Sequence, residues 1–488
     1  MICMYKIYID GSWVNSFSGK TFESFNPATR KSIGTFQQGD AADAKQAIDA
    51  AQDAQKNWAD TPAPSRAKIL FNIRDLLIKD KERLGRLVTT EMGKILKEGM
   101  GDIQEAIDIF EYMAGEGRRL FGHTVPSELP DKFSMTTRLP IGVVSVITPW
   151  NFPIAVPAWK MAAALICGNS IVWKPSSDTP LCAVELVKIF EKAGMPKGVV
   201  NLVTGPGSSV GDELVRNKAV SGISFTGHRD TGEDILRKAG VKRVGLELGG
   251  KNGIIVMDDA DLGLAVDGIV WGAYGTSGQR CTAASRIIAH EKISQKLERL
   301  LISRIAKIRV GNGLQKTTDM GPLINEGAIK KCEKYIEIGK NEGAKLAYGG
   351  KRLNSKGYFF SPSLFTKVTS DMRIAQEEIF GPVLSMITVK NFDEVIDTIN
   401  SVDYGLSSSI YTKDMKAAFR AVREIEAGLT YVNSSTTGSE AHMPFGGVKG
   451  TGNGVREAGI MGIEEFSNVK TVYFDYSGRL QKAQIDTG

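Results

Sequence analysis

The short run Gly275-Thr276-Ser277-Gly278-Gln279-Arg280-Cys281 combines small, flexible residues with a single thiol. Its glycines and small hydroxyl side chains let the backbone turn tightly and approach a ligand closely. Arg280 directly precedes the cysteine, and a nearby positive charge favours the thiolate, which is the nucleophilic form. The run therefore predicts a sharp loop that carries a nucleophilic cysteine. The alternative is a small buried hydrophobe, the usual environment of a free cysteine.

Glu247 is a second residue suited to chemistry, because it lies between Leu246 and Leu248 and just before two glycines. A carboxyl group in apolar surroundings has a raised pKa and can act as a general base near neutral pH. The alternative is a carboxylate paired with Lys242 or Lys251. The local sequence leaves both interpretations open.

A third chemical group lies in Thr148-Pro149-Trp150-Asn151-Phe152-Pro153, which directly follows an apolar run. Two prolines stiffen this loop and fix the direction of the Asn151 side chain. A fixed amide N–H is the kind of donor that stabilises a developing oxyanion. The alternative is a local turn in which Asn151 satisfies neighbouring backbone groups.

Three further segments have the composition of nucleotide contacts. Val172-Trp173-Lys174-Pro175-Ser176-Ser177 supplies a lysine and two hydroxyls that can hold ribose or phosphate. Phe225-Thr226-Gly227-His228-Arg229-Asp230-Thr231-Gly232 places a glycine turn before a helix start, where backbone N–H groups bind anions, but it lacks the GxGxxG fingerprint. Glu377-Glu378-Ile379-Phe380-Gly381-Pro382 offers carboxylates for ribose hydroxyls and an aromatic ring for a flat ligand. Taken singly, the first segment also fits a surface loop, the second is weak evidence of a site, and the third fits a charged helix end better than a ribose contact.

The overall composition excludes several classes of protein. The net charge of +6 is small for 488 residues and no long basic run occurs, which argues against a nucleic-acid partner. The five cysteines are scattered and odd in number, which argues against a disulfide framework and structural zinc. The four histidines have no metal-ligand spacing, so no metal site is predicted. Residues 1–10 lack a signal-peptide core and the apolar run 153–173 is interrupted by Lys160 and prolines, so we expect a cytoplasmic protein without membrane spans.

The chain is long enough for two or three domains, and its patterning predicts where the elements lie. Residues 5–36 read as short strands and turns, Asp40 and Ser65 as the N-caps of two helices, and residues 100–120 as a third helix. Residues 470–476 alternate and predict a terminal strand that pairs with an edge and contacts another subunit. From residue 141, apolar runs alternate with helical patterns and predict two parallel sheets, whose ligands bind at the carboxyl ends of the strands. The runs are residues 141–147, 170–173, 199–203, 221–225 and 244–248, then 253–256, 286–289, 359–365 and 382–389.

One motif suggests a different chemistry. Gly207-Ser208-Ser209-Val210-Gly211 matches the GxSxG pattern of a serine hydrolase. However, Ser208 follows a Pro-Gly turn, where serine is a common N-cap, and no suitable Asp and later His partner stands out. We therefore set the hydrolase aside.

In this order and at these separations, the segments closely resemble the NAD(P)-dependent aldehyde dehydrogenase superfamily over essentially the whole chain, including Met443-Pro444-Phe445-Gly446-Gly447-Val448-Lys449. The resemblance implies an α/β fold with a Rossmann-type cofactor domain (residues 1–117 and 141–248) and an α/β catalytic domain (249–450). It also implies a β-ribbon oligomerisation element (118–140 and 467–488) and a homodimer or homotetramer.

The resemblance also implies roles for individual residues. Cys281 would attack the aldehyde, the Asn151 amide and the Cys281 N–H would hold the oxyanion, and Glu247 would activate water to release the acid. Lys160 and Glu457 match positions linked in the family to orienting groups or relaying protons. The implied NAD(P) contacts are Ile147, Trp150, Lys174, Ser176, Ser177, Gly207, Phe225, Gly227, Gly232, Leu248, Glu378 and Phe380.

Two departures from the family pattern bear on specificity. NAD-preferring relatives often have a glutamate where Ser177 stands, and a serine beside Lys174 leaves room for a 2′-phosphate, so we expect NADP ahead of NAD. Succinic semialdehyde dehydrogenases typically have an arginine at the position of Trp159, which weakens that assignment. Arg280 and the polar loop 433–442 suggest a hydrophilic substrate mouth. Residues 443–459 resemble the branch of glyceraldehyde and 2-oxoglutarate semialdehyde dehydrogenases, and we place glyceraldehyde narrowly first.

Rival activities use the same cysteine. An acylating dehydrogenase would pass the thioester to coenzyme A, but Glu247 argues for water as the acceptor. A cysteine hydrolase would need a histidine partner for Cys281, for which His290 and His442 are the available residues.

Overall fold

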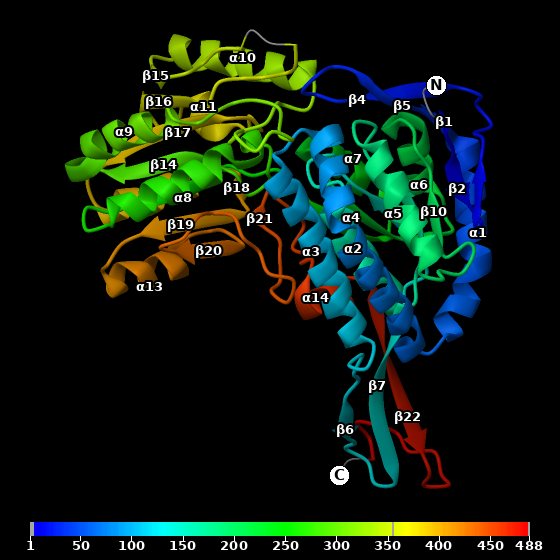
Figure 1. The fold of residues 1–488 in the computed structure, drawn as a ribbon. Helices are drawn as coiled ribbons and strands as arrows, with labels where there is room; N and C mark the ends of the chain where they lie inside the picture. Colours follow the sequence, from blue (N-terminus) through cyan, green and yellow to red (C-terminus); the bar gives the residue numbers. More distant parts are fainter. Residues whose placement is uncertain (1–3, 354–355, 487–488) are drawn as a thin grey trace.

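The computed structural model describes residues 4–353 and 356–486, so Cys3 lies outside the described part of the chain. Figure 1 shows two α/β bodies side by side and a narrow β-ribbon that extends away from them. The predicted α/β fold with a separate ribbon is confirmed.

The first seven-stranded sheet is formed mainly by the runs predicted between residues 141 and 248. Its central strands β8, β9, β10, β11 and β12 are paired in parallel, and the N-terminal hairpin β2–β3 extends the edge in antiparallel fashion. The apolar central strands are buried, as expected for a sheet covered on both faces. In sheet order the strands are β12 (Arg243–Glu247), β11 (Val220–Thr226), β8 (Val143–Ile147), β9 (Ser170–Lys174), β10 (Val200–Leu202), β2 (Ile7–Ile9) and β3 (Ser12–Val14).

Helices cover this sheet, and two of them, α2 and α3, pack along each other beside α4 (Figure 1). Their apolar faces meet in the largest hydrophobic cluster, which includes Leu70, Ile103, Phe110 and Leu165. The helices of this part are α1 (Ala41–Asp60), α2 (Ala63–Met92), α3 (Leu96–Glu116), α4 (Ala155–Cys167), α5 (Pro180–Lys192), the π-helical turn η1 (Gly207–Gly211), α6 (Asp212–Arg216) and α7 (Arg229–Ala239).

The second seven-stranded sheet is parallel except for its edge strand β15. Its order is β15 (Lys345–Tyr348), β16 (Ser363–Val368), β17 (Val383–Val389), β14 (Ala284–His290), β13 (Asn252–Val256), β19 (Ser407–Tyr411) and β20 (Leu429–Val432). The accompanying helices are α8 (Leu262–Tyr274), the 3-10 turn η2 (Gly275–Gly278), α9 (Glu291–Ile305), α10 (Glu326–Asn341), α11 (Arg373–Gln376), α12 (Phe392–Asn400) and α13 (Met415–Glu424).

The ribbon is a three-stranded antiparallel sheet of order β22 (Ser467–Asp475), β7 (Lys132–Pro140) and β6 (Thr124–Pro126). The alternating tail therefore does pair with a distant strand, in a register that runs from Ser467 opposite Pro140 to Asp475 opposite Lys132. Helix α14 (Gly459–Glu465) leads into β22. Two small sheets complete the fold: β1 (Met4–Tyr5), β5 (Ser32–Gln37) and β4 (Thr21–Phe25), and β18 (Tyr404–Gly405) with β21 (Val448–Lys449).

The predicted helix caps were partly wrong. Asp40 caps α1 as expected, because its side chain accepts from the backbone N–H groups of Ala42 and Asp43. Ser65 does not cap α2, which begins two residues earlier, after Pro62, without a side-chain cap. Ser208 likewise lies inside η1 and is not its cap. In both cases a proline, Pro62 or Pro206, occupies the N-cap position that was expected for the serine.

Candidate active site

The loop before Cys281 adopts a strained backbone. Thr276 and Ser277 have φ values of 51° and 58°, and Gly278 continues the left-handed turn at 70°. Such a conformation costs about 1–3 kcal/mol per residue and persists only where surrounding contacts impose it. A Cβ on Gly278 would lie 2.4 Å from the Gly381 carbonyl oxygen, so only glycine fits there. The loop is therefore held in one tight shape that presents Cys281.

The Cys281 side chain is half-buried and its thiol is surrounded by acidic groups. Burial, reinforced by the negative charges of Glu247 and Glu378, raises the pKa of Cys281 to about 12. Glu247 is therefore within electrostatic range of the sulfur. At neutral pH the group is therefore a protonated thiol.

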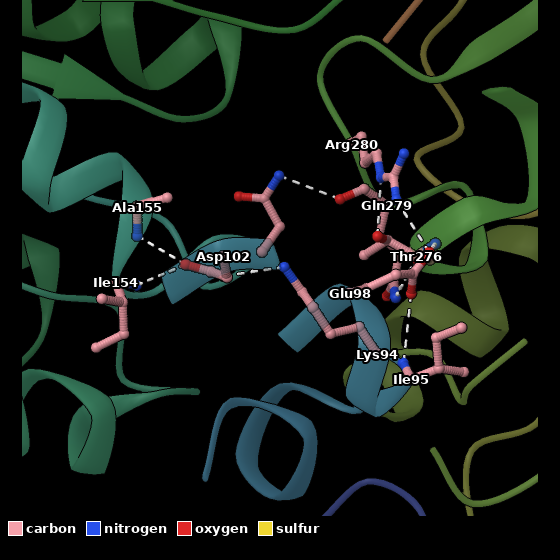
Figure 2. A network of polar contacts seen from close by, with 10 residues as sticks. Lys94, Ile95, Glu98, Asp102, Ile154, Ala155, Thr276, Gln279 and Arg280 are labelled. Carbon is pink, nitrogen blue, oxygen red and sulfur yellow. Dashed lines mark hydrogen bonds and ion pairs between the residues drawn. The ribbon is translucent and has the colours of Figure 1, made fainter. Parts of the chain in front are cut away.

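Arg280 interacts electrostatically with Cys281, but its hydrogen bonds go to other partners. Its guanidinium donates to Glu98 Oε1 at 2.9 Å and to Thr276 Oγ1 at 2.8 Å, and its Cζ lies 4.5 Å from the centroid of the Trp271 ring. Only 8% of Arg280 is exposed, so it does not contribute a free charge to the substrate mouth. Figure 2 shows the side chain directed to Glu98 and Thr276.

The Asn151 side chain contacts the loop that precedes Cys281. The residue is buried, and its Nδ2 donates to the backbone carbonyl of Gln279 at 3.1 Å. Because this partner is far away in sequence, the local-turn alternative for the amide nitrogen is wrong. The Gln279 side chain is itself fixed, since its Oε1 accepts from Ile324 N at 2.9 Å. The structure thus places a side-chain amide next to the segment that presents Cys281.

Glu247 ends β12 in an apolar, enclosed position. It is 4% exposed, and neither carboxylate oxygen has a hydrogen-bond partner among the described residues. Burial and the neighbouring Glu457 raise the pKa of Glu247 well above its ordinary value. The alternative pairing is excluded, because Lys242 donates to the Val215 carbonyl and Lys251 donates to the Glu377 carbonyl.

Lys160 and Glu457 form a buried ion pair near Glu247. The Lys160 ammonium also donates to Ser224 Oγ at 3.1 Å, and its positive charge lowers the pKa of Glu247. Glu465 is a third buried carboxylate in this group, and burial followed by repulsion from Glu457 raises its pKa to about 8. The nearby Ser224 hydroxyl lowers the pKa of Glu465, although the distance and angle between the two groups do not meet the criteria for a hydrogen bond.

Glu465 was missed from the sequence because it directly follows Glu464 at the end of a short helix. Only the structure separates the exposed Glu464 from the buried Glu465. No spacing or composition signal distinguishes them.

A cavity of about 390 Å³ lies at the carboxyl ends of β8, β9 and β11. Four of the predicted cofactor residues line it: Ile147, Lys174, Gly207 and Phe225. This is the expected position for a ligand in an open parallel sheet. Burial lowers the pKa of Lys174 to about 8, and within the described part of the chain its ammonium donates only to the Pro175 carbonyl, at 2.9 Å. A phosphate would supply the counter-charge that this lysine lacks.

The turn between β11 and α7 is shaped by close packing. A Cβ on Gly232 would lie 2.6 Å from a methyl carbon of Leu248, so glycine lets the start of α7 approach that buried residue. Gly227 N donates to the Glu247 carbonyl at 3.1 Å, which ties this turn to β12. The observed cradle fits a dinucleotide phosphate at the helix N-terminus.

Lys174 lines the cavity, but the two serines that follow it, Ser176 and Ser177, do not. Ser176 Oγ accepts from Asp178 N at 3.2 Å, and Ser177 is exposed and does not line the cavity. A side chain at position 177 can therefore reach only the rim of the site.

Glu378 and Phe380 lie after α11, and the Phe380 ring contacts Trp150. Glu378 Oε1 accepts from Gly250 N at 2.9 Å, and burial raises the pKa of Glu378. The Phe380 ring meets Trp150 edge-to-face with centroids 5.5 Å apart. The charged-helix-end alternative holds for Glu377, which pairs with Arg373, but not for Glu378.

The polar loop 433–442 reaches the nucleophile segment through Thr436, whose hydroxyl donates to the Thr282 carbonyl at 2.8 Å. Within this loop, Thr437 Oγ1 and Ser439 Oγ are buried without a partner among the described residues. The same is true of the indole N–H of Trp159, whose ring contacts Phe445 edge-to-face at 4.9 Å. Unsatisfied buried donors are costly and call for a partner.

The histidines do not support a cysteine hydrolase. The His290 side chain caps α9 by accepting from Lys292 N, and His442 is largely exposed and faces Glu440 at 3.4 Å. Over residues 4–353 and 356–486, no cluster of three His, Cys, Asp or Glu side chains could hold a metal ion. In the same residues, no helix combines the length and apolar character required to cross a bilayer.

Comparisons with known proteins agree with this geometry. Residues 13–472 match the model of the aldehyde dehydrogenase family. The chain is 41% identical to the alpha-ketoglutaric semialdehyde dehydrogenase of Bacillus subtilis, over 96% of this chain and 98% of the relative. It is also 41% identical to the D-glyceraldehyde dehydrogenase (NADP(+)) of Picrophilus torridus, over 97% and 96%. A crystal structure of Staphylococcus aureus betaine aldehyde dehydrogenase in complex with NAD+ superposes with a TM-score of 0.95, at 39% identity over 98% of this chain and 96% of that chain.

The protein is therefore an oxidoreductase with an aldehyde dehydrogenase-like fold. It belongs to the aldehyde dehydrogenase family.

Proposed function

We propose that the protein oxidises a short hydroxylated aldehyde, with glyceraldehyde as the preferred substrate and glycerate as the product, and that it uses NADP in preference to NAD. The observation that carries the substrate class is the set of unpaired buried donors at Trp159, Thr437 and Ser439. A substrate that bears hydroxyl groups can satisfy these donors, whereas an aliphatic aldehyde leaves them unpaired. Polar sites of this kind discriminate strongly against analogues that lack the matching group.

The proposed chemistry begins at Cys281. Its sulfur forms a bond to the aldehyde carbon, the thiol proton leaves to a nearby acceptor, and a thiohemiacetal results. The Asn151 amide stabilises the oxyanion together with the Cys281 backbone N–H. After oxidation to the thioester, Glu247 takes a proton from water, the hydroxide attacks the thioester carbon, and the carboxylic acid leaves as the thiol is regenerated.

Lys160 and Glu457 support the water step. Their buried pair lies in electrostatic contact with Glu247, so a proton taken from water can be shared among these groups. The Lys160 charge also keeps the pKa of Glu247 from rising still further.

The residues of the cleft fit a bound dinucleotide. Lys174, Ser176, Gly207, Gly227 and Gly232 would hold its adenosine and pyrophosphate part. The remaining contacts would come from Ile147, Trp150, Ser177, Phe225, Leu248, Glu378 and Phe380. When bound, the nicotinamide accepts the hydride released from the substrate carbon. The exposed Ser177, in place of a carboxylate, leaves the rim open to a 2′-phosphate, and the relative from Picrophilus torridus is named for NADP(+).

The principal alternative substrate is 2-oxoglutarate semialdehyde (2,5-dioxopentanoate), because three relatives carry that activity in their names. Succinic semialdehyde comes after it. Both carry a carboxylate, and Arg280 does not counter that charge because it is already paired with Glu98.

The test is a panel of aldehydes assayed with NADP and NAD by following the reduced cofactor. We expect kcat/KM to be highest for glyceraldehyde and at least tenfold lower for propanal, which has the same carbon chain without hydroxyls. Trp159→Phe and Thr437→Val should lower the ratio of kcat/KM for glyceraldehyde to kcat/KM for propanal. Trp58→Phe is the matched control, because the Trp58 indole N–H is also buried and unpaired but lies in α1. A best rate with propanal or a longer aliphatic aldehyde would overturn the substrate proposal.

We also propose that the chain is a homodimer or homotetramer joined through the ribbon. Support comes from the large exposed apolar side chains along β7 and β22: Phe133, Leu139, Val469, Tyr473 and Phe474.

We propose a division into three parts, which the three larger sheets support. They are a cofactor domain (residues 1–117 and 141–248), a catalytic domain (249–450) and the oligomerisation element (118–140 and 467–488).

A further inference from the structure

Among the buried carboxylates of helix α3, Glu98 and Asp102 lie four residues apart and therefore on one side of the helix. Figure 2 shows that they point to different segments. Asp102 points to the start of α4, which directly follows the Asn151 loop, and Glu98 points to the loop before Cys281.

Glu98 holds the nucleophile loop through several bonds. Its Oε1 accepts from the backbone N–H of Thr276 at 2.8 Å and from the Arg280 guanidinium at 2.9 Å. Its Oε2 accepts from Ile95 N at 3.3 Å, at the start of its own helix. Within this loop, Thr276 has a left-handed backbone, which is unfavourable for its branched side chain. The Glu98 carboxylate thus bonds directly to the strained part of the turn.

Asp102 holds the neighbouring loop in the same manner. Its Oδ1 accepts from the backbone N–H groups of Ile154 and Ala155, at 3.3 and 2.7 Å. Its Oδ2 pairs with the Lys94 ammonium at 3.0 Å, and both side chains are fully buried. The same ammonium lies 3.6 Å from the centroid of the Phe152 ring, and Phe152 is the residue after Asn151. Lys94 and Asp102 therefore hold the C-terminal end of this loop, directly after Asn151.

We propose that Glu98 and Asp102 are positioning residues, which together set the separation between the Asn151 amide and Cys281. One turn of α3 holds both loops, so the helix acts as a rigid spacer between the oxyanion donor and the nucleophile. Buried ion pairs contribute little net stability compared with well-packed apolar side chains, so their value here lies in geometry. A small displacement of a reacting group is enough to slow an enzymatic step severely. This inference rests on the proposed function, in which thiol and amide act on the same aldehyde.

A matched control exists in the same part of the molecule. Glu91 is also fully buried, and its carboxylate accepts from Leu181 N and Cys182 N, at 2.8 Å each, at the start of α5. It therefore has the same structural task as Asp102, but at a helix whose preceding loop carries neither Asn151 nor Cys281.

The experiment compares Glu98→Ala and Asp102→Ala with Glu91→Ala. The quantities measured are the rate of cofactor reduction in the first turnover, the Kd for NADP, the rate of Cys281 alkylation by iodoacetamide, and Tm. We expect the first two variants to lose at least tenfold in the first-turnover rate, with Kd unchanged within twofold. Glu91→Ala should lower Tm to a similar degree and keep the rate within twofold of the parent.

Equal loss of rate in Glu91→Ala, or an unchanged rate in both α3 variants, would overturn the proposal. The isosteric set Glu98→Gln, Asp102→Asn and Glu91→Gln gives the same comparison if an alanine variant does not fold, with at least threefold loss expected in the first two only. A parent protein that reduces no cofactor with any aldehyde refutes the proposed function instead. In that case alkylation still tests the positioning, since Glu98→Gln should change the Cys281 rate at least threefold and Glu91→Gln should not.

Discussion

The Asn151 side chain donates to the backbone carbonyl of Gln279, two residues before Cys281, at 3.1 Å. This bond joins a loop of the first sheet to a loop that leads into the second. It also fixes the amide plane, so that the second N–H of the same group remains free to bind an oxyanion.

Replacing Asn151 with alanine should therefore lower kcat by about 10²–10³, the usual effect of removing one oxyanion donor. The steady-state rate with glyceraldehyde measures this, and alkylation of Cys281 shows whether the thiol remains accessible. Asn201→Ala is the control, because the Asn201 amide is also buried and donates to the carbonyls of Ile171 and Gly198. It should lower stability but not kcat, and an equal loss of kcat there would argue against an oxyanion role.

The high pKa of Cys281 predicts a simple pH dependence. With a pKa of about 12, the thiolate fraction in the protein without ligands rises about tenfold per pH unit from pH 7 to 10. The rate of alkylation by iodoacetamide should rise with the same slope, and Cys281→Ser should abolish it. A plateau near pH 8 would show that the acidic surroundings do not suppress the thiolate. At pH 9, Glu247→Gln should react faster than the parent, because it removes a negative neighbour that raises the pKa of the thiol.

Local sequence patterns predicted a large part of this site, for identifiable reasons. The loops of Asn151 and Cys281 and the apolar setting of Glu247 are encoded by adjacent prolines, glycines and leucines, so their character is visible in a few residues. The parallel strands were likewise apparent from short apolar runs, and Asp40 from its position before an amphipathic helix.

What the sequence could not reveal depends on partners that are distant along the chain. The direction of Arg280 is set by Glu98, 182 positions earlier, so its hydrogen-bond partner could not be read from its place beside Cys281. The left-handed backbone of Thr276 contradicts its residue type and exists because outside contacts impose it. The burial of Glu465 arises from packing of α14 near α4, which no local pattern records.

The buried pair of Lys160 and Glu457 predicts a double-mutant signature. Lys160→Met leaves the Glu457 carboxylate buried without its partner and should cost about 3–5 kcal/mol in the free energy of unfolding. Glu457→Gln in the same protein should recover most of that loss, and urea unfolding of the four proteins measures the coupling. Strict additivity of the two single effects would contradict a direct pair.

Removal of Lys160 should also displace the pH profile of the enzyme. Its charge lowers the pKa of Glu247, so without it that pKa rises and the carboxylate needed as base forms only at higher pH. The acid limb of kcat against pH should therefore shift upward in Lys160→Met. An unshifted limb would show that Lys160 acts only in folding.

The state of Lys174 predicts how cofactor preference changes with pH. Burial lowers the pKa of Lys174 to about 8, and a 2′-phosphate, which favours the charged form, would raise it. NADP binding then takes up a proton above pH 8, so its Kd should rise by up to about tenfold per pH unit there and stay nearly constant between pH 7 and 8. NAD lacks this phosphate, and its Kd should change much less. Titration of both cofactors by fluorescence from pH 7 to 9.5 measures the difference.

Two variants test separately how the Lys174 charge and the small Ser177 side chain contribute to the preference for NADP over NAD. Lys174→Met should weaken NADP binding and flatten its pH dependence, because no ammonium remains to titrate. Ser177→Glu should reverse the preference toward NAD, since a carboxylate at this exposed position repels the 2′-phosphate and can accept hydrogen bonds from ribose hydroxyls. A parent protein with a clear NAD preference, or a Ser177→Glu variant that still prefers NADP, would show that position 177 does not determine the cofactor.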